Sequence, residues 1–343
     1  MNKELSEIPL VSIRLMTFNH EKYIEEALQS IDSQKTNFNF EVVIGDDFSS
    51  DNNLDKIKNY CFINKKLSVN ILKRTHGDSY YLKRKEKGRL FNFVDILNNC
   101  RGKYIALLDG DDYWTDPLKL QKQVDMLEAN PQLVACHHWQ YIAIKKGGRF
   151  VELEAPIKGH GYFPQSTSNV ENIFSNQVRL KTRTVMFRNI ISKDFFPSWF
   201  YKVAFGDVPL SFLLGMHGDF GFIDEPMAVY RNTEEGASLS GLKELGRKKF
   251  KVQHFKNWIQ IWDYADKFYG FKYHKEASET VLKFYKKITA NLPITVRSFI
   301  KVLYYDIFER KLPFQHKLAS SKWIVFYYLK KLGSKLKRKI TTS

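Results

Sequence analysis

The sequence predicts an α/β protein with a mainly parallel sheet covered by helices on both faces, followed by a helical, basic C-terminal region. Two observations carry this prediction. Over the first 135 residues, apolar runs typical of buried strands alternate with stretches of helical periodicity, and acidic residues directly follow two of those runs. Strands that alternate with helices form parallel sheets, and ligands of such sheets gather where the strands end.

Four short strands are expected before residue 110, and each is an apolar run bounded by polar residues. They are Leu10–Met16, Phe40–Ile44, Val69–Leu72 and Tyr104–Leu108. Between and after them, apolar side chains three and four residues apart predict helices. These helices are expected at 23–31, with Asn19 as the residue that caps it, and at 55–62, 90–97 and 118–127.

The later part of the chain mixes strand and helix signals. Strand-like pieces are expected at 133–136, 184–187, 220–223 and 227–230, and a helix is expected at 208–216. From about residue 243 the pattern is helical, and Pro293 and Pro313 are expected to break it, because proline lacks the backbone N–H that a helix interior uses.

Charge divides the 343-residue chain unevenly. Residues 241–343 hold 24 Lys+Arg and 7 Asp+Glu, which is the whole net charge of +17, whereas residues 1–240 hold 30 of each sign. This asymmetry predicts a neutral catalytic domain over 1–240 and a basic, aromatic-rich helical region over 241–343. The three cysteines are scattered, and no signal peptide or 18-residue apolar stretch is found, so a reduced cytoplasmic protein is expected.

Three carboxylates occur within four residues, at Asp109, Asp111 and Asp112, directly after an apolar run. Carboxylates so close together repel one another unless a cation lies among them, and Mg²⁺ or Mn²⁺ usually shares such oxygens with a phosphate. The cluster therefore predicts a metal that carries a phosphorylated ligand. A solvated acidic turn before a helix is the alternative. A calcium-binding EF-hand is excluded, because the sixth position is Trp114 and the twelfth is Leu120.

Four segments, in this order and spacing, resemble the family 2 glycosyltransferases, which have the GT-A fold. They are 11–19, 43–51 (Val-Ile-Gly-Asp-Asp-Phe-Ser-Ser-Asp), 104–114 and 206–210, and the resemblance covers about residues 10–240. It implies an inverting enzyme that transfers a sugar from a nucleotide-diphosphate sugar, with UDP favoured. The acceptor is a hydroxyl of a glycan or lipid-linked saccharide, in surface polysaccharide or lipopolysaccharide-type synthesis.

The resemblance also implies roles for individual residues. Asp46 and Asp47 would bind the uracil and ribose of the donor, and Thr17 and Asn19 would line the same pocket. Asp109 and Asp111 would hold Mn²⁺ or Mg²⁺ against the diphosphate, with Asp112 supporting the sugar or the metal. Each of the first four residues has a plainer alternative, as a helix cap or a turn residue.

Asp207 matches the position of the catalytic base, which takes the proton of the acceptor hydroxyl. It could also cap the helix at 208–216, and the two roles can coexist. Many relatives carry a histidine where Thr233 stands here. Arg231 or the basic segment 83–85 is then expected to contact the diphosphate, and 83–85 is expected to be a mobile, solvated lid. His137 and His138 are expected in the core or the acceptor pocket, and 181–184 on the acceptor side.

The C-terminal cations are interleaved with aromatic residues, which suits the surface of an anionic membrane. We therefore expect a cytoplasmic protein attached peripherally to the inner face of the cell membrane. Two other functions compete. A sugar-1-phosphate nucleotidyltransferase would need a glycine-rich loop after the first strand, and 17–20 has no glycine. A nucleic-acid-binding protein would use the basic region but would leave the acidic cluster unexplained, so nucleic acid is not an expected partner.

Overall fold

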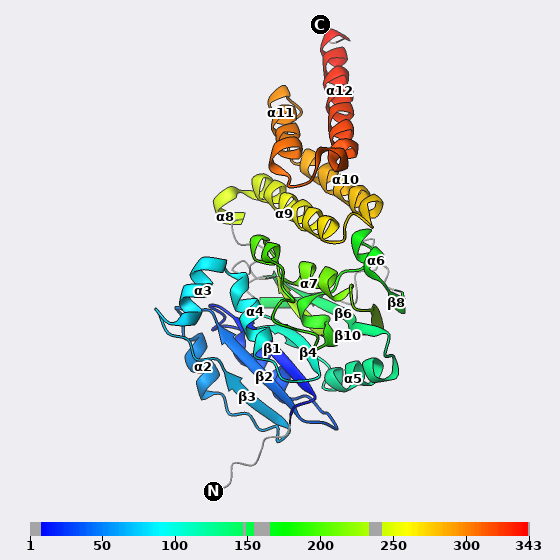
Figure 1. Ribbon diagram of the computed structural model, residues 1–343. Coiled ribbons are helices and arrows are strands. Elements are labelled where there is room, and N and C mark those ends of the chain that lie inside the picture. Colours follow the sequence, from blue (N-terminus) through cyan, green and yellow to red (C-terminus); the bar gives the residue numbers. More distant parts are fainter. Residues whose placement is uncertain (1–7, 147–148, 154–164, 233–241, 342–343) are drawn as a thin grey trace. The chain divides into compact units, whose positions relative to one another are not determined.

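The computed structural model describes residues 8–146, 149–153, 165–232 and 242–341. The chain forms two compact units (Figure 1). Unit 1 comprises residues 1–170 and 177–236, and unit 2 comprises residues 171–176 and 237–343.

Unit 1 is built on one mixed sheet. Its strand order is β3-β2-β1-β4-β9-β6-β10-β5, with β7 paired to β6 and β8 paired to β10. The strands are β1 (Val11–Thr17), β2 (Phe40–Asp46), β3 (Leu67–Ile71), β4 (Tyr104–Asp109), β5 (Tyr113–Trp114), β6 (Leu133–Lys146), β7 (Arg149–Leu153), β8 (Thr167–Ser168), β9 (Met186–Arg188) and β10 (Asp219–Asn232). The first four strands are mutually parallel, and β6 and β10 share their direction because β9 is antiparallel to both β4 and β6. The predicted mainly parallel sheet is confirmed.

Helices cover both faces of this sheet (Figure 1). The helices of unit 1 are α1 (Ile24–Asp32), α2 (Asn53–Asn59), α3 (Ser79–Lys87), α4 (Leu90–Asn98), α5 (Lys119–Ala129) and α7 (Asp207–Leu214), with 3₁₀ turns η1 (Thr182–Thr184) and η2 (Ser198–Lys202). Helix α6 (Val170–Phe174) belongs to unit 2 except for its first residue. On one face, side chains of α1, α2 and α5 pack on alternate residues of β1, β2 and β4 such as Ile13. On the other face, the Phe93 ring of α4 lies over the guanidinium of Arg14, which β1 directs away from that core.

Most predicted elements are present, and the differences have local causes. The pieces at 220–223 and 227–230 are one strand, β10, because Pro226 lies at a register shift where its missing N–H is tolerated. The loop expected at 83–85 is wrong: these residues belong to helix α3, which Asp78 caps by accepting a hydrogen bond from the Tyr81 N–H. Asn19 does not cap α1 either, since Tyr23 occupies that position.

Unit 2 is helical, as predicted. Its elements are α8 (Leu242–Leu245), α9 (Arg247–Phe268), α10 (His274–Ala290), α11 (Val296–Tyr304), the π-helical turn η3 (Tyr305–Glu309), the 3₁₀ turn η4 (Phe314–Lys317) and α12 (Leu318–Thr341). Both expected breaks are observed, because Pro293 lies between α10 and α11 and Pro313 lies between η3 and η4.

A buried charge network joins the helices of unit 2. The Arg310 guanidinium donates to both carboxylate oxygens of Asp263 at 2.9 and 2.6 Å, and to Asp306 Oδ1 at 2.7 Å. Asp306 also accepts hydrogen bonds from the Tyr285 and Ser320 hydroxyls. One cation thus compensates two buried carboxylates that belong to different helical segments.

Replacing Arg310 with alanine is expected to destabilise unit 2 by about 3–5 kcal/mol, because Asp263 and Asp306 would stay buried without their cation. Urea denaturation followed by circular dichroism measures this loss. Arg297→Ala is the matched control, because Arg297 is exposed on α11 and should change stability by less than about 0.5 kcal/mol. Equal unfolding midpoints for the two variants would contradict the prediction.

Candidate active site

The predicted site residues meet where three parallel strands end. The register pairs Thr17 of β1 with Asp46 of β2 on one side, and Met16 of β1 with Asp109 of β4 on the other. Because parallel strands end at the same edge of the sheet, side chains that are separated by up to 92 residues come together there.

Asp46 is buried and largely satisfied by protein donors. Its Oδ1 accepts hydrogen bonds from the Ser49 hydroxyl at 2.5 Å and from the Asn53 amide at 2.7 Å, and its Oδ2 accepts one from the Ser49 N–H at 2.9 Å. Asn53 in turn accepts a hydrogen bond from the Thr17 hydroxyl at 3.2 Å. An ionised carboxylate offers about four acceptor positions, so Asp46 keeps one for a ligand donor.

Two loops at this edge are joined by Asn19. Its side-chain oxygen accepts a hydrogen bond from the Ser50 N–H at 2.8 Å, and its own N–H donates to the Ser49 hydroxyl at 2.8 Å. Asn19 (φ 54°) and Phe48 (φ 63°) both adopt the left-handed conformation, which is uncommon for residues other than glycine. Asn19 therefore acts as a turn residue that holds the β1 and β2 loops together.

Asp47 is held by helix α3. The Arg84 guanidinium donates to both of its carboxylate oxygens at 2.7 to 3.0 Å, and the Tyr80 hydroxyl donates to Oδ1 at 2.9 Å. Arg84 belongs to the basic segment 83–85 that was expected to form a lid. It is held by Asp47, the residue that was expected to bind the nucleotide. These four hydrogen bonds use the acceptor positions of Asp47, so a ligand would have to share or displace Arg84.

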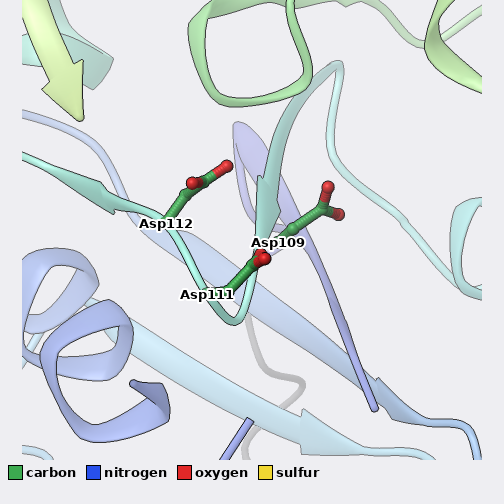
Figure 2. Close-up of side chains that lie close together, drawn as sticks. All are labelled: Asp109, Asp111 and Asp112. Carbon is green, nitrogen blue, oxygen red and sulfur yellow. The ribbon is translucent and has the colours of Figure 1, made fainter. Parts of the chain in front are cut away.

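The acidic cluster forms one tight turn between β4 and β5. Figure 2 shows the Asp109, Asp111 and Asp112 side chains projecting from this turn, and one carboxylate oxygen from each lies within 4.8 Å of the others. Gly110 permits the turn, because a Cβ there would lie 2.8 Å from the Thr17 hydroxyl oxygen and 2.9 Å from His20 Nδ1. The cluster can therefore approach the β1 loop closely.

The three carboxylates have different partners. Asp109 Oδ1 accepts a hydrogen bond from Arg14 Nη2 at 3.0 Å. Both oxygens of the buried Asp112 are used, by Arg183 Nε at 2.6 Å and by the Arg231 N–H at 2.9 Å. Within the described residues, the basic side-chain nitrogen within 4 Å of the Asp111 carboxylate is His20 Nε2, at 3.9 Å. Asp111 and the second oxygen of Asp109 are thus the groups open to a ligand.

Burial disfavours the ionised form of the carboxylates in this cluster. It raises the pKa of Asp111 to about 6, and the neighbouring Asp109 charge adds to the rise. Burial also raises the pKa of Asp112, although the Arg183 guanidinium opposes that rise. A cation placed among these groups would relieve the repulsion and restore the ionised forms.

The donor set fits a hard divalent ion. Oxygen ligands from two carboxylates suit Mg²⁺ or Mn²⁺, which usually complete their coordination with water and substrate phosphate. Beside the cluster, the fully buried Arg14 leaves its Nε and Nη1 without a hydrogen-bond partner among the described residues. The same guanidinium donates to Asp109 through Nη2, so its charge is paired with the acidic cluster.

Asp207 is the first residue of α7, and its carboxylate accepts a hydrogen bond from the Val208 N–H at 2.9 Å. The N-cap residue of α7 is Gly206, so Asp207 does not cap the helix as the alternative interpretation expected, although it contacts the backbone of the first turn. Burial raises the pKa of Asp207, the cations Lys181 and Arg183 oppose the rise, and the charge of Asp109 adds to it. Asp207 thus lies within electrostatic range of the acidic cluster.

Arg231 is buried on β10, and its guanidinium has protein partners. It donates to the Asp111 carbonyl oxygen at 3.0 Å, contacts Glu26 and lies over the Tyr113 ring. Thr233, which the sequence places at the position of a family histidine, lies outside the described residues. His137 and His138 are both buried on β6, and burial lowers the pKa of His137 to about 3, as expected for core histidines.

Arg14 and His20, which shape this site, were not predicted from the sequence, and Arg183 was expected only as part of 181–184 on the acceptor side. Arg14 holds Asp109, His20 faces Asp111, and Arg183 binds Asp112. Arg14 had a signal, since a cation in the middle of an apolar strand is unusual. Arg183 had none, because its partner is 71 residues away in the sequence.

Comparisons with known proteins agree on one family. The model for glycosyl transferase family 2 matches residues 12–193. An uncharacterized protein of Mycobacterium tuberculosis is 32% identical over 240 residues, which cover 70% of this chain and 63% of that protein. A Bacillus subtilis glycosyltransferase named for teichuronic acid biosynthesis is 29% identical over 119 residues, covering 35% of this chain and 42% of its own. This chain thus spans less than two thirds of the length of these relatives.

The chain is also similar to a solved structure of S. aureus TarS (residues 1–349) in complex with UDP-GlcNAc. The TM-score is 0.49 at 16% sequence identity, and the likeness covers 93% of this chain and 89% of that one.

Proposed function

The chain belongs to glycosyl transferase family 2, and we propose that it transfers a sugar from a nucleotide-diphosphate sugar, with UDP favoured, to a hydroxyl of a glycan or lipid-linked saccharide. The observation that carries this proposal is the meeting of Asp46 and the Asp109–Asp111 pair at one edge of the sheet, with Asp207 near enough for the Asp109 charge to raise its pKa. In this proposal the arrangement would supply a nucleotide contact, a metal site and a base. We propose a role in surface polysaccharide synthesis.

In this proposal, Asp46 accepts a hydrogen bond from the nucleoside at its one open position. Asp109 and Asp111 would hold Mn²⁺ or Mg²⁺, which would neutralise the charge that develops on the departing diphosphate. Arg14 keeps one Asp109 oxygen in place, and Arg183 with the Arg231 N–H occupies both oxygens of Asp112. The protein thereby fixes the geometry of the turn before any ligand binds.

Asp207 would act as the general base. As the acceptor oxygen forms a bond to the anomeric carbon, its proton passes to the Asp207 carboxylate, and the bond to the nucleoside diphosphate breaks on the opposite face. One such displacement inverts the anomeric configuration. The raised pKa of Asp207 favours this role, because a carboxylate with a higher pKa is a stronger base.

We also propose that the basic region 241–343 attaches the protein peripherally to an anionic membrane surface, where a lipid-linked acceptor would lie. Its charge of +17 supports this proposal. Among the described residues, each helix is too short or too polar to span a bilayer.

Thermal denaturation with a panel of nucleotide sugars tests the proposed donor. With Mn²⁺, the correct donor at about 100 times its Kd should stabilise unit 1 by about 2.7 kcal/mol, or about 5–10 °C in Tm. Donor with EDTA and free sugar with Mn²⁺ are the controls, and both should leave Tm nearly unchanged. If every nucleotide sugar left Tm unchanged with Mn²⁺ present, the donor proposal would fail.

A further inference from the structure

A row of large apolar side chains lies exposed along one face of unit 2. Val296, Ile300, Tyr304 and Phe308 follow one another at every fourth position of α11 and η3, and they are 60%, 60%, 54% and 66% exposed. Residues four apart lie on the same helix face, so the row, here called the α11 stripe, extends over about 18 Å.

The stripe is not needed for the core of unit 2. The opposite face of the helix is already packed, with Val302 and Tyr305 buried and the Phe299 ring 5.5 Å from the Tyr328 ring of α12. The helix therefore has two apolar faces and uses one of them internally. A contiguous exposed apolar row of this kind usually marks an interaction surface.

Cations accompany the stripe. The exposed Arg297 and Lys301 follow Val296 and Ile300 in sequence, so they form a parallel row one position around the helix. A shallow groove of about 590 Å³ is lined by both rows. The exposed surface of 241–343 is basic as a whole, because three of its seven acidic residues, Asp263, Asp266 and Asp306, are buried.

We propose that the α11 stripe is the surface that docks unit 2 on an anionic lipid bilayer. The four apolar side chains would enter the headgroup region, and Arg297 and Lys301 would contact lipid phosphates. A second copy of this chain suits the stripe less well, because two regions that each carry +17 repel one another. The inference rests on the proposed membrane attachment and identifies the side chains that perform it.

Flotation of the full-length protein with lipid vesicles tests the proposal. The wild-type protein should float with vesicles of phosphatidylcholine and phosphatidylglycerol, float less in high salt, and stay behind with phosphatidylcholine alone. The double variant Ile300→Glu/Phe308→Glu should bind at least about tenfold more weakly, because it places charge where apolar side chains enter the interface. Ile63→Glu is the matched control, since Ile63 is 83% exposed in unit 1, and it should bind like the wild type.

The charge row gives a second test that does not alter the apolar side chains. Arg297→Glu/Lys301→Glu should lower binding to the anionic vesicles by at least about tenfold, whereas Lys65→Glu, an exposed lysine of unit 1, should have little effect. Circular dichroism confirms folding of each variant. If Ile300→Glu/Phe308→Glu fails to fold, the comparison of Arg297→Glu/Lys301→Glu with Lys65→Glu tests the docking surface by itself.

Several outcomes would overturn the inference. One is equal flotation of both double variants and the wild type. Another is a wild-type dimer in sedimentation velocity that Ile300→Glu/Phe308→Glu dissociates, which would make the stripe a self-association surface. The Tm increase with nucleotide sugar and Mn²⁺ belongs to unit 1 and should be the same in all variants. Its absence in the wild type would count against the proposed donor, not against the docking surface.

Discussion

Asp111→Asn is expected to lower the rate of sugar transfer by about 10³-fold or more. A bound metal contributes several kcal/mol to neutralising a departing diphosphate, and each 1.36 kcal/mol corresponds to a factor of ten in rate. Asp111 is the member of the acidic turn whose carboxylate is least used by protein donors, whereas Asp112 is held by Arg183 and the Arg231 N–H. The substitution removes its charge without changing its volume, so the fold should persist.

The measurement is the transfer rate as a function of Mn²⁺ concentration, with Mn²⁺ affinity determined by calorimetry. Asp125→Asn is the control, because Asp125 is an exposed carboxylate on α5 and its loss should change neither quantity. Undiminished transfer by chelator-treated wild-type protein, or by Asp111→Asn, would show that the acidic turn does not hold a metal required for the reaction.

The same carboxylate predicts how metal binding depends on pH. Burial and the Asp109 charge raise the pKa of Asp111 to about 6, and a metal binds the ionised form. Protons therefore compete below about pH 6, so Mn²⁺ affinity should fall as the pH decreases through that value and become constant above it. Electron paramagnetic resonance of free Mn²⁺ measures the affinity at each pH. In Asp111→Asn the affinity should depend less on pH than in the wild type.

Asp207→Asn is expected to lower kcat by about 10²–10⁴-fold, the usual contribution of a positioned general base. The asparagine side-chain oxygen can still accept the hydrogen bond that Asp207 takes from the Val208 N–H, so the start of α7 should be preserved. The donor-induced Tm increase should therefore equal that of the wild type. Full activity in this variant would reduce Asp207 to a residue that supports the helix.

A pH profile separates the base from the helix role. The base must be ionised, and burial raises the pKa of Asp207 while Lys181 and Arg183 oppose the rise. Wild-type kcat/KM should thus increase with pH through a pKa above the ordinary range of aspartate. In Asp207→Asn, kcat/KM should no longer rise with pH in this range. If Asp207 only supports the helix, the rise should be the same in the variant as in the wild type.

The sequence by itself determined strands β1 to β4, most helices and the acidic turn. Helix α1 follows from local periodicity, because burial on one face imposes a repeat that a short segment already displays. Strands β1, β2 and β4 follow from short continuous apolar runs, because these strands are buried on both faces. The triple carboxylate was also recognisable locally, since the repulsion arises among neighbours in the chain. Helix α3 had local signals as well, in its Asp78 cap and in Gly88 (φ 82°), but its run of cations favoured a solvated loop.

Only the tertiary structure decided which carboxylates have oxygens that no protein donor uses and that a ligand can therefore reach. Arg14 reaches Asp109 across 95 residues, Arg183 reaches Asp112 across 71, and the Arg231 N–H reaches Asp112 across 119. These pairs depend on the order of strands in the sheet, which places β10 beside β5 and β4 beside β1. Strand order results from the packing of the whole unit, because hydrogen bonding between strands is nearly independent of their sequence. Local patterns in one sequence therefore identify the charged residues but not their partners.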